Sequence, residues 1–236
     1  MLSRKTPVPK EIPSNYAEFI YPNENRVYLP LPEDLGSQTF EDVLSRRRSR
    51  REFLPVPEHK LSALLWFAFK VHEHRADDKW QHRPCPSAGG RHPIDILVIS
   101  STAQLVGDKD VFVYEPIAHV LIRQNVPMHK VSKLIDETDH VLSIQSATIL
   151  WFVAQPGRTL SKYENGESLI WRDAGAMIAT TCLVAEALRL NCCAIGTTGE
   201  PMISDMFEAG QTLFGVGGCL IGESQGEGNK KTPKSK

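Results

Sequence analysis

The chain has 236 residues, enough for one substantial hydrophobic core but crowded for two full domains. It is 41% hydrophobic and 23% charged with a formal net charge of −1, which is ordinary for a globular protein and argues against a nucleic-acid partner. The N-terminus, MLSRKTPVPKEIPSNY, has no secretory apolar core and no apolar run reaches a membrane-spanning length, so we expect a cytoplasmic protein without a membrane partner.

The N-terminal third of the chain predicts an arm followed by two helices. Residues 1–38 are rich in proline and lack periodicity, which indicates an extended arm lying over a surface. The sequence Thr39-Phe40-Glu41-Asp42 is typical of a capping box, so a helix should begin there. Pro55 and Pro57 separate this helix from a second, in which apolar residues recur at helical spacing over residues 61–69.

The middle of the chain predicts strands that alternate with longer connections. Residues 72–84 are polar and are expected to form a loop. The sequence IDILVIS, residues 94–100, predicts a strand, and residues 111–115 predict a shorter one. A helix of mixed polarity is expected over residues 126–140. Residues 148–154, TILWFVA, are nearly all apolar, as in a strand covered on both faces.

The longest helix is expected over residues 169–190, after a loop at 155–167. This helix is apolar around much of its circumference, which is typical of a helix in a core or at a subunit interface. Residues 194–199 should form a turn that leads to a short helix near residues 201–207. The remaining elements are a last buried strand at residues 218–222 and a flexible polar tail, residues 223–236.

Neither the cysteines nor the histidines predict a metal site. The five cysteines are odd in number and form no C-x-x-C pair, so reduced and mostly buried thiols are expected. The polar stretch before the first strand is rich in histidine and aspartate but lacks the i, i+4 spacing of a zinc helix, so a solvated loop is the favoured interpretation. The residues concerned are Cys85, Cys182, Cys192, Cys193, Cys219, His72, His74, Asp77, Asp78 and His82.

An arginine run follows the first predicted helix. Arg47-Arg48-Ser49-Arg50-Arg51 could hold a phosphate, because guanidinium groups match phosphate oxygens in a bidentate fashion. A solvated face and a nucleic-acid patch are the alternatives. Phe53-Leu54-Pro55 follows at once, which places the run beside packed structure.

Two short loops could lie against a flat ligand. Pro86-Ser87-Ala88-Gly89 combines a hydroxyl with small residues, and backbone without side chains can approach a ring closely. The alternative is a Gly-Gly turn that merely enters a strand. The turn Ile195-Gly196-Thr197 could direct a backbone N–H at a ligand, or it could be an ordinary helix stop.

In this order and spacing, the segments resemble the FMN-dependent nitroreductase family. The run from Arg47 to Phe53 is similar to the opening signature of that family, Arg-Arg-Ser-x-Arg-x-Phe. Residues 86–90 with Pro93 resemble the small-residue loop of its SagB-type azoline dehydrogenase branch, which oxidises thiazolines and oxazolines in ribosomal peptides. Asp173-Ala174-Gly175-Ala176, which opens the long helix, resembles the same branch. The resemblance covers residues 39–222, the expected FMN-binding domain.

The resemblance implies an α+β fold with a mixed, mainly antiparallel sheet flanked by helices, and a homodimer with the FMN site at its interface. Arg47 and Ser49 would hold the phosphate and ribityl chain, and Arg51 would lie near the pyrimidine edge of the flavin. The loop at 86–89 would contact the ring from the partner subunit, and the backbone at Gly196 or Thr197 would donate to N5. The implied cofactor-binding set is Arg47, Arg48, Ser49, Arg51, Pro86, Ser87, Ala88, Gly89, Ile195, Gly196 and Thr197.

A Lys-Tyr pair is a further point of resemblance. Azoline dehydrogenases carry such a pair shortly before the long helix, and Lys162-Tyr163 stands within about one position of that place by the spacing of the loop. The alternative is a surface loop with a common dipeptide. One departure concerns the phosphate site: many family members add a basic residue near the C-terminus, where this chain has Gly222 and Glu223. The arginine run alone could suffice, or a tail lysine such as Lys230 could fold back.

The implied activity is FMN-dependent oxidoreduction, by hydride transfer from an azoline or related C–N bond to flavin N5. The alternative within the fold is NAD(P)H-dependent reduction of nitroaromatics or quinones, and a non-catalytic flavin-binding protein is the alternative from another class. The substrate would be a small molecule or a peptide.

Overall fold

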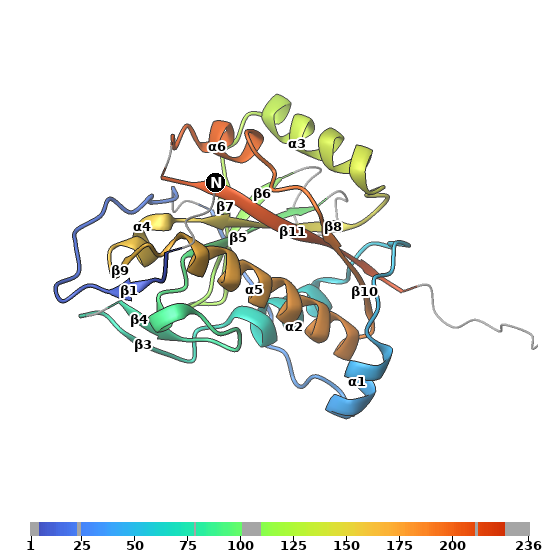
Figure 1. Cartoon of the computed structure of the whole chain (residues 1–236). Helices are drawn as coiled ribbons and strands as arrows, with labels where there is room; N and C mark the ends of the chain where they lie inside the picture. Colours follow the sequence, from blue (N-terminus) through green and yellow to red (C-terminus); the bar gives the residue numbers. More distant parts are fainter. Residues whose placement is uncertain (1–4, 23–24, 78, 101–109, 211, 225–236) are drawn as a thin grey trace, which may run out of the picture.

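The fold is built on one seven-stranded sheet with the strand order β10-β11-β8-β5-β6-β7-β2 (Figure 1). The computed structural model describes residues 5–22, 25–77, 79–100, 110–210 and 212–224. Every pairing between the described strands of this sheet is antiparallel. The expected α+β class with a mainly antiparallel sheet is therefore confirmed, and no parallel pair is seen in the part of the sheet that is described. The strands are β2 (Arg26–Tyr28), β5 (Ile94–Ser100), β6 (Val111–Glu115), β7 (Val120–Gln124), β8 (Thr148–Ala154), β10 (Leu190–Ile195) and β11 (Phe214–Glu223).

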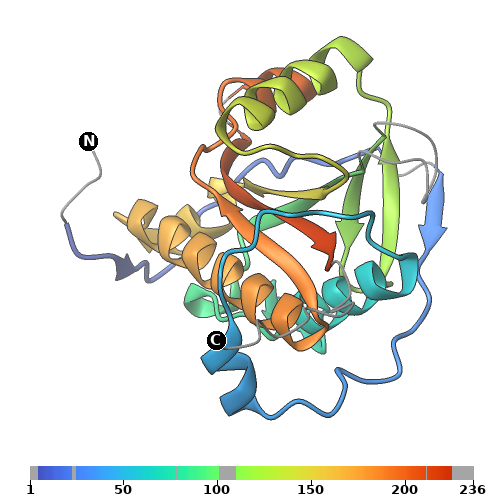
Figure 2. The same ribbon diagram turned by 90° about the vertical axis from the view of Figure 1, so that its right-hand side faces the viewer.

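Helices cover both faces of the sheet, which gives three layers (Figures 1 and 2). The helices α2 (Glu58–Phe69) and α5 (Glu167–Ala187) pack on one face, and α3 (Met128–Val141) and α6 (Met202–Phe207) pack on the other. Strand β8 lies between the two layers and all seven of its residues are buried, as its apolar sequence predicts. None of the helices described is long and apolar enough to span a bilayer.

The first helix, α1 (Phe40–Arg46), begins where the capping box predicts. The Thr39 side chain accepts from the backbone of Asp42, and the Asp42 carboxylate accepts from the backbone of Thr39. The helix ends at the arginine run, whose first member, Arg47, is its C-cap. Phe53 is 3% exposed, so the run does lie beside packed structure.

Two segments predicted to be loops contain regular structure, and both predictions were wrong. Residues 72–84 hold the hairpin β3 (Glu73–Arg75) and β4 (Trp80–His82), whose turn has Lys79 at a φ of 54° without a glycine to signal it. Residues 155–167 hold the short helix α4 (Pro156–Leu160) and the strand β9 (Tyr163–Glu164). Pro156 occupies the first turn of α4, where the lack of an N–H costs nothing.

The long helix ends three residues earlier than predicted. Helix α5 ends at Ala187, and Arg189 takes a left-handed φ of 56° at the position where glycine usually stops a helix. Leu190 then begins strand β10, so Ala194 and Ile195 are strand residues and the turn starts at Gly196. The interpretation of Ile195-Gly196-Thr197 as a helix stop was therefore wrong, because the turn follows a strand.

The N-terminal arm contributes two strands. Residues of β1 (Val8–Pro9) pair with β9, and β2 forms the edge of the main sheet beside β7. The rest of the described arm forms neither helix nor strand. From residue 225 onward the predicted tail, with Lys230, lies outside the described residues.

Candidate active site

The loop at residues 86–90, here called the glycine loop, is anchored to helix α5 by one buried carboxylate. It forms a short 3-10 turn, Ala88–Gly90, in which Gly89 and Gly90 both have a φ of 63°. The Ser87 hydroxyl donates to Asp173 Oδ2 at 2.6 Å, and the Ala88 N–H donates to Asp173 Oδ1 at 3.3 Å. Burial raises the pKa of Asp173, and the two hydrogen bonds oppose this rise. The carboxylate therefore sets the position of the loop relative to α5.

Lys162 and Tyr163 lie directly against Gly89. A Cβ atom placed on Gly89 would be 2.6 Å from the Tyr163 hydroxyl oxygen and 3.2 Å from Lys162 Nζ. Any side chain at this position would displace these two polar ends, and the left-handed φ independently favours glycine. The glycine loop and the Lys-Tyr pair, about seventy residues apart in the sequence, thus form one constellation.

The backbone of the Lys-Tyr pair is held from two sides. The arm pairs with it on the outside: the Lys10 N–H donates to Lys162 O at 2.8 Å, and Pro9 faces Tyr163 in the β1–β9 ladder. On the inside, the Arg91 guanidinium at the end of the glycine loop donates to the carbonyl of Arg158 at 2.8 Å and to the hydroxyl of Ser161 at 3.3 Å. Sequence reasoning did not single out Arg91, which fixes the two loops to each other.

The arginine run lies at the other end of α5. Arg47, Arg48 and Arg51 are exposed, as is Ser49. Arg50 instead turns inward and forms an ion pair with the buried carboxylate of Glu186 on α5, and its backbone N–H donates to Cys192 O at 3.1 Å. The alternation separates one structural arginine, Arg50, from three that face solvent, Arg47, Arg48 and Arg51.

The turn after β10 offers open backbone. Gly196 and Thr197 are exposed, and a Cβ on Gly196 would meet no atom within 4 Å. Cys192, whose carbonyl accepts from the Arg50 N–H, lies in β10 four residues before Gly196, or about 13 Å at 3.3 Å per residue. Ala194, between them, is exposed. A ligand with an anionic end at the arginines and a flat end at Gly196 could therefore lie along β10.

The predicted site residues do not all meet within one chain. Asp173 holds the glycine loop near the start of α5, and Glu186 holds the arginine run near its end. Thirteen residues of helix separate them, which is about 20 Å at 1.5 Å per residue. The structure brings the glycine loop together with the Lys-Tyr pair, and it places the arginines apart from both.

The carboxylate of Glu223, at the place where many family members add a basic residue, is paired within the chain. The Lys60 ammonium of α2 donates to the Glu223 carboxylate at 2.7 Å, beside the point where Leu54 pairs with Glu223. The negative charge that departs from the family pattern is therefore offset. No sequence signal marks this pair, because its two members are more than 160 residues apart.

His92, next to the glycine loop, is a structural residue. Burial and the charge of Arg83 lower its pKa to about 3, so the imidazole is neutral. In that state its Nε2–H donates to the carbonyl of Gln81 at 3.1 Å, and its backbone N–H donates to the Ser87 hydroxyl at 2.9 Å. His92 is therefore a hydrogen-bonded histidine of the scaffold that holds the glycine loop in place.

Comparison with solved structures finds the same fold in several bacterial proteins. A putative nitroreductase from Ralstonia eutropha JMP134 is 22% identical with a TM-score of 0.63, and the match covers 93% of this chain and 99% of that one. The Escherichia coli microcin synthetase McbBCD complex with truncated pro-MccB17 bound is 18% identical with a TM-score of 0.60, covering 86% and 79%. A putative nitroreductase in complex with FMN from Desulfovibrio desulfuricans is 15% identical with a TM-score of 0.52, covering 84% and 92%.

At these identities the solved structures support the fold alone. Comparison with curated proteins gives no match. The model of the nitroreductase family, in contrast, matches residues 44–222, which is about three quarters of the chain and includes the arginine run, the glycine loop, the Lys-Tyr pair and strands β5 to β11. On this match, the chain belongs to the nitroreductase family of flavin oxidoreductases.

Proposed function

We propose that the chain is an FMN-dependent dehydrogenase of an azoline ring or a related C–N bond. The observation that carries the proposal is the packing of Lys162 Nζ and the Tyr163 hydroxyl against Gly89, in the loop expected to contact the flavin. A nitroreductase that only passes electrons from a nicotinamide to an acceptor has less need of two proton-transferring side chains at this point. The likeness in fold to a microcin synthetase complex with a bound propeptide lends support.

The residues of the chain fit FMN at two places. The exposed guanidinium groups of Arg47 and Arg48, with the Ser49 hydroxyl, would hold the phosphate and ribityl chain, and Arg51 would lie toward the ring. The open backbone at Gly196 and Thr197 would lie against the isoalloxazine, because no side chain blocks the approach there. Ile195, buried beneath them, would support the turn, and the Glu200–Pro201 peptide would follow it.

When bound, FMN supplies the acceptor for a hydride that leaves a ring carbon of the substrate. The second hydrogen must leave as a proton, and this is the task of the chain. Tyr163 and Lys162 present an oxygen and a nitrogen that can take up and pass on that proton. Ser87 and Asp173 hold the loop that faces this pair, and thereby fix where the substrate can lie between the proton acceptor and the flavin. Oxygen is the expected reoxidant.

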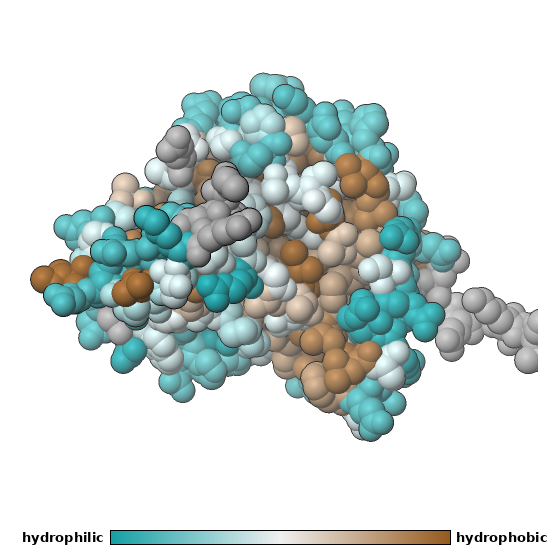
Figure 3. Space-filling model, in the orientation of Figure 1, coloured by the Kyte–Doolittle hydropathy of each residue, from teal (hydrophilic) through white to brown (hydrophobic). Residues whose placement is uncertain are grey.

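The site would be completed by a second copy of the chain. Within one chain the arginines and the glycine loop lie at opposite ends of α5, so one flavin cannot reach both. In an antiparallel pair of α5 helices, the start of one helix would lie beside the end of the other and bring the two halves together. The exposed residues of α5 include Trp171 near its start and the small residues Gly175 and Ala179 near its middle. Beside it, α1 exposes Phe40 and Leu44, and Figure 3 shows hydrophobic surface over this region.

The proposed chemistry can be tested by anaerobic reduction of the bound flavin. A thiazoline-containing peptide should bleach the wild-type flavin. Tyr163→Phe and Lys162→Met should keep FMN bound and lose bleaching by roughly 10²-fold or more, the usual contribution of a general base. Tyr28→Phe, on the exposed edge strand, is the matched control and should bleach normally. Fast bleaching by NADH or NADPH, with none by the peptide, would instead assign the chain to the reductases.

The shared site can be tested by mixing two inactive variants. Arg47→Glu removes the phosphate end from one chain, and Gly89→Trp blocks the glycine loop in another. If each site draws its halves from two chains, a one-to-one mixture exchanged to equilibrium regains about a quarter of wild-type activity, because half of the dimers then carry one intact site of two. A site contained in one chain would show no recovery.

A further inference from the structure

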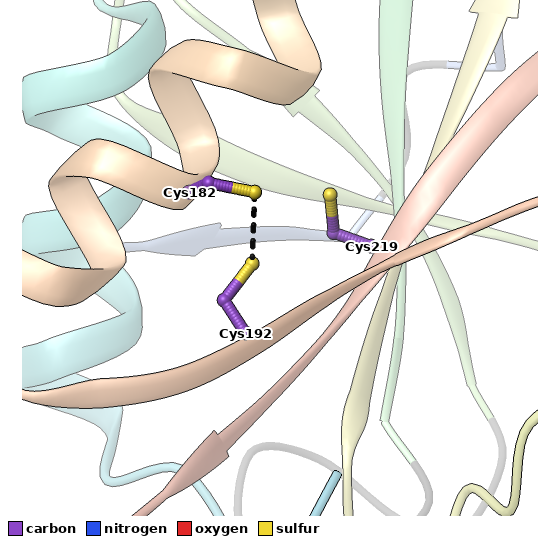
Figure 4. A group of neighbouring side chains, drawn as sticks. All are labelled: Cys182, Cys192 and Cys219. Carbon is purple, nitrogen blue, oxygen red and sulfur yellow. Dashed lines mark hydrogen bonds between the residues drawn. The ribbon is translucent and has the colours of Figure 1, made fainter. Parts of the chain in front are cut away.

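Three thiols from different elements converge on the α5 side of the sheet. Cys182 lies on α5, Cys192 on β10 and Cys219 on β11, and their sulfur atoms all lie within 4.8 Å of one another (Figure 4). The sulfurs of Cys182 and Cys192 are 3.6 Å apart. No other group of three metal-ligating side chains was found among the residues that the structure describes. We call these three residues the thiol cluster.

The convergence is specific to these three cysteines. Cys193, which follows Cys192, packs in the core on the opposite face of the sheet, since neighbouring strand residues point to opposite faces. Its sulfur donates to the Ala194 carbonyl of its own strand at 3.6 Å. The sequence could not signal the cluster, because its members are 10 and 27 residues apart and share no motif.

The spacing of the sulfurs is near that of thiolates around a small soft cation. A zinc–sulfur bond of about 2.3 Å places two sulfurs of a tetrahedral site about 3.8 Å apart. The pair Cys182–Cys192 already has this separation, and the third sulfur would need to move by roughly 1 Å at most, which is within reach of a side-chain rotation. Two buried cysteines supply a rigid base, and half-buried Cys182 supplies a route from solvent.

The charges around the cluster favour a first thiolate at Cys182. Hydrogen bonds from the neighbouring thiols lower the pKa of Cys182, and the positive charge of Arg47 acts in the same direction. Donation to Cys182 and burial raise the pKa of Cys192 and Cys219, and a bound cation would displace their protons. Three thiolates and one divalent ion would leave one negative charge, which Arg47 is placed to offset.

We propose that the thiol cluster binds one thiolate-preferring divalent metal ion of the Zn²⁺ type. Binding releases the remaining S–H protons to solvent, involves no oxidation, and joins α5 to β10 and β11. Strand β10 is in turn bonded to the arginine run, through the Arg50 N–H to Cys192 O and through the Asn191 side chain to Glu52 O at 2.7 Å. A bound ion would therefore stiffen the base of that run.

The site can be tested with Cd²⁺, a spectroscopic probe for thiolate ligands, on the full-length chain after reduction and treatment with a chelator. The wild type should develop a thiolate-to-cadmium absorption band that saturates at one ion per chain and is displaced by Zn²⁺. Cys182→Ser should abolish most of this band and weaken binding by roughly tenfold or more. Cys193→Ser is the matched control and should leave both unchanged.

Three results would overturn the proposal. The first is a folded wild type without the absorption band, which needs no variant and so does not depend on how the variants fold. The second is an equal effect of Cys182→Ser and Cys193→Ser in protein shown by circular dichroism to be folded. The third is a Cys182–Cys192 disulfide, found by peptide mass analysis after mild oxidation, in a chain that binds no ion. None of these readouts depends on flavin or on enzyme activity, so they stand apart from the proposed function.

Discussion

Gly89→Ala is the substitution that tests the constellation of the glycine loop most sharply. The substitution is expected to have two separate effects, one on the backbone and one on the neighbouring side chains. An L side chain at a φ of 63° is destabilising by about 1–2 kcal/mol, because the left-handed region crowds Cβ against the backbone. The new methyl would also lie 2.6 Å from the Tyr163 hydroxyl oxygen and 3.2 Å from Lys162 Nζ, so these two side-chain ends would have to move aside. Because both are the ends of flexible side chains, this displacement should add little to the loss of stability but should move both polar groups from their places.

Gly36→Ala is a control that strains the backbone in the same way but displaces no neighbouring side chain. Gly36 has a φ of 86°, and a Cβ there would meet no atom within 4 Å. Urea unfolding should therefore show a similar loss, about 1–2 kcal/mol, for Gly36→Ala and for Gly89→Ala. Substrate oxidation should fall only for Gly89→Ala, by up to about 10²-fold, since a displacement of about 1 Å at a reacting pair can cost that much. Unchanged oxidation in Gly89→Ala would refute the packing of Lys162 and Tyr163 on Gly89.

Three further predictions follow from other contacts. Arg50→Ala should destabilise the fold by about 2 kcal/mol in urea unfolding. This is less than the roughly 3–5 kcal/mol of a fully buried ion pair, because a third of the Arg50 side chain is exposed. Arg48→Ala should leave unfolding unchanged and weaken FMN binding in a titration. The pKa of Asp173 is raised in the folded state, so its contribution to stability is full at low pH and is lost as pH rises through that pKa. The wild type should therefore lose stability relative to Asp173→Asn between acidic and neutral pH. Parallel curves of unfolding free energy against pH for the two proteins would count against this. Deletion of residues 1–14 removes the backbone hydrogen bonds from Lys10 and Ser14 to residues 161–162, which help to position the Lys-Tyr pair. Flavin should therefore remain bound while azoline oxidation slows. Unaltered kinetics would show that the arm does not position the Lys-Tyr pair.

Sequence patterns predicted the secondary structure correctly where local interactions determine it. The Thr39 capping box marks the start of α1, and the apolar run at 148–154 marks a strand buried on both faces. They failed where a non-glycine residue takes a left-handed conformation. Arg189 ends α5 and Lys79 closes the β3–β4 hairpin in this way, and neither residue type signals a turn. Both residues are exposed, so neither a glycine nor an apolar pattern marks these two turns in the sequence.

The candidate site was visible in the sequence only as separate pieces. The arginine run and the glycine loop each carry a recognisable composition, and the resemblance joined them. What the sequence could not show is that Gly89 touches the Lys-Tyr pair, that Asp173 anchors the loop, and that Arg50 is committed to Glu186. Asp173 did leave a trace, since a carboxylate near the start of an otherwise apolar helix indicates a buried partner. No sequence pattern indicated the thiol cluster.

The measurement that bears most directly on the account is a titration of flavin-free wild-type protein with FMN, followed by fluorescence and by analytical ultracentrifugation. We predict saturation at one FMN per chain in a dimer, and a marked loss of affinity in Arg47→Ala, whose side chain is exposed and supports no other part of the fold. A folded chain that binds no FMN at saturating concentrations, or that binds it equally well as a monomer and without Arg47, would contradict the proposed site.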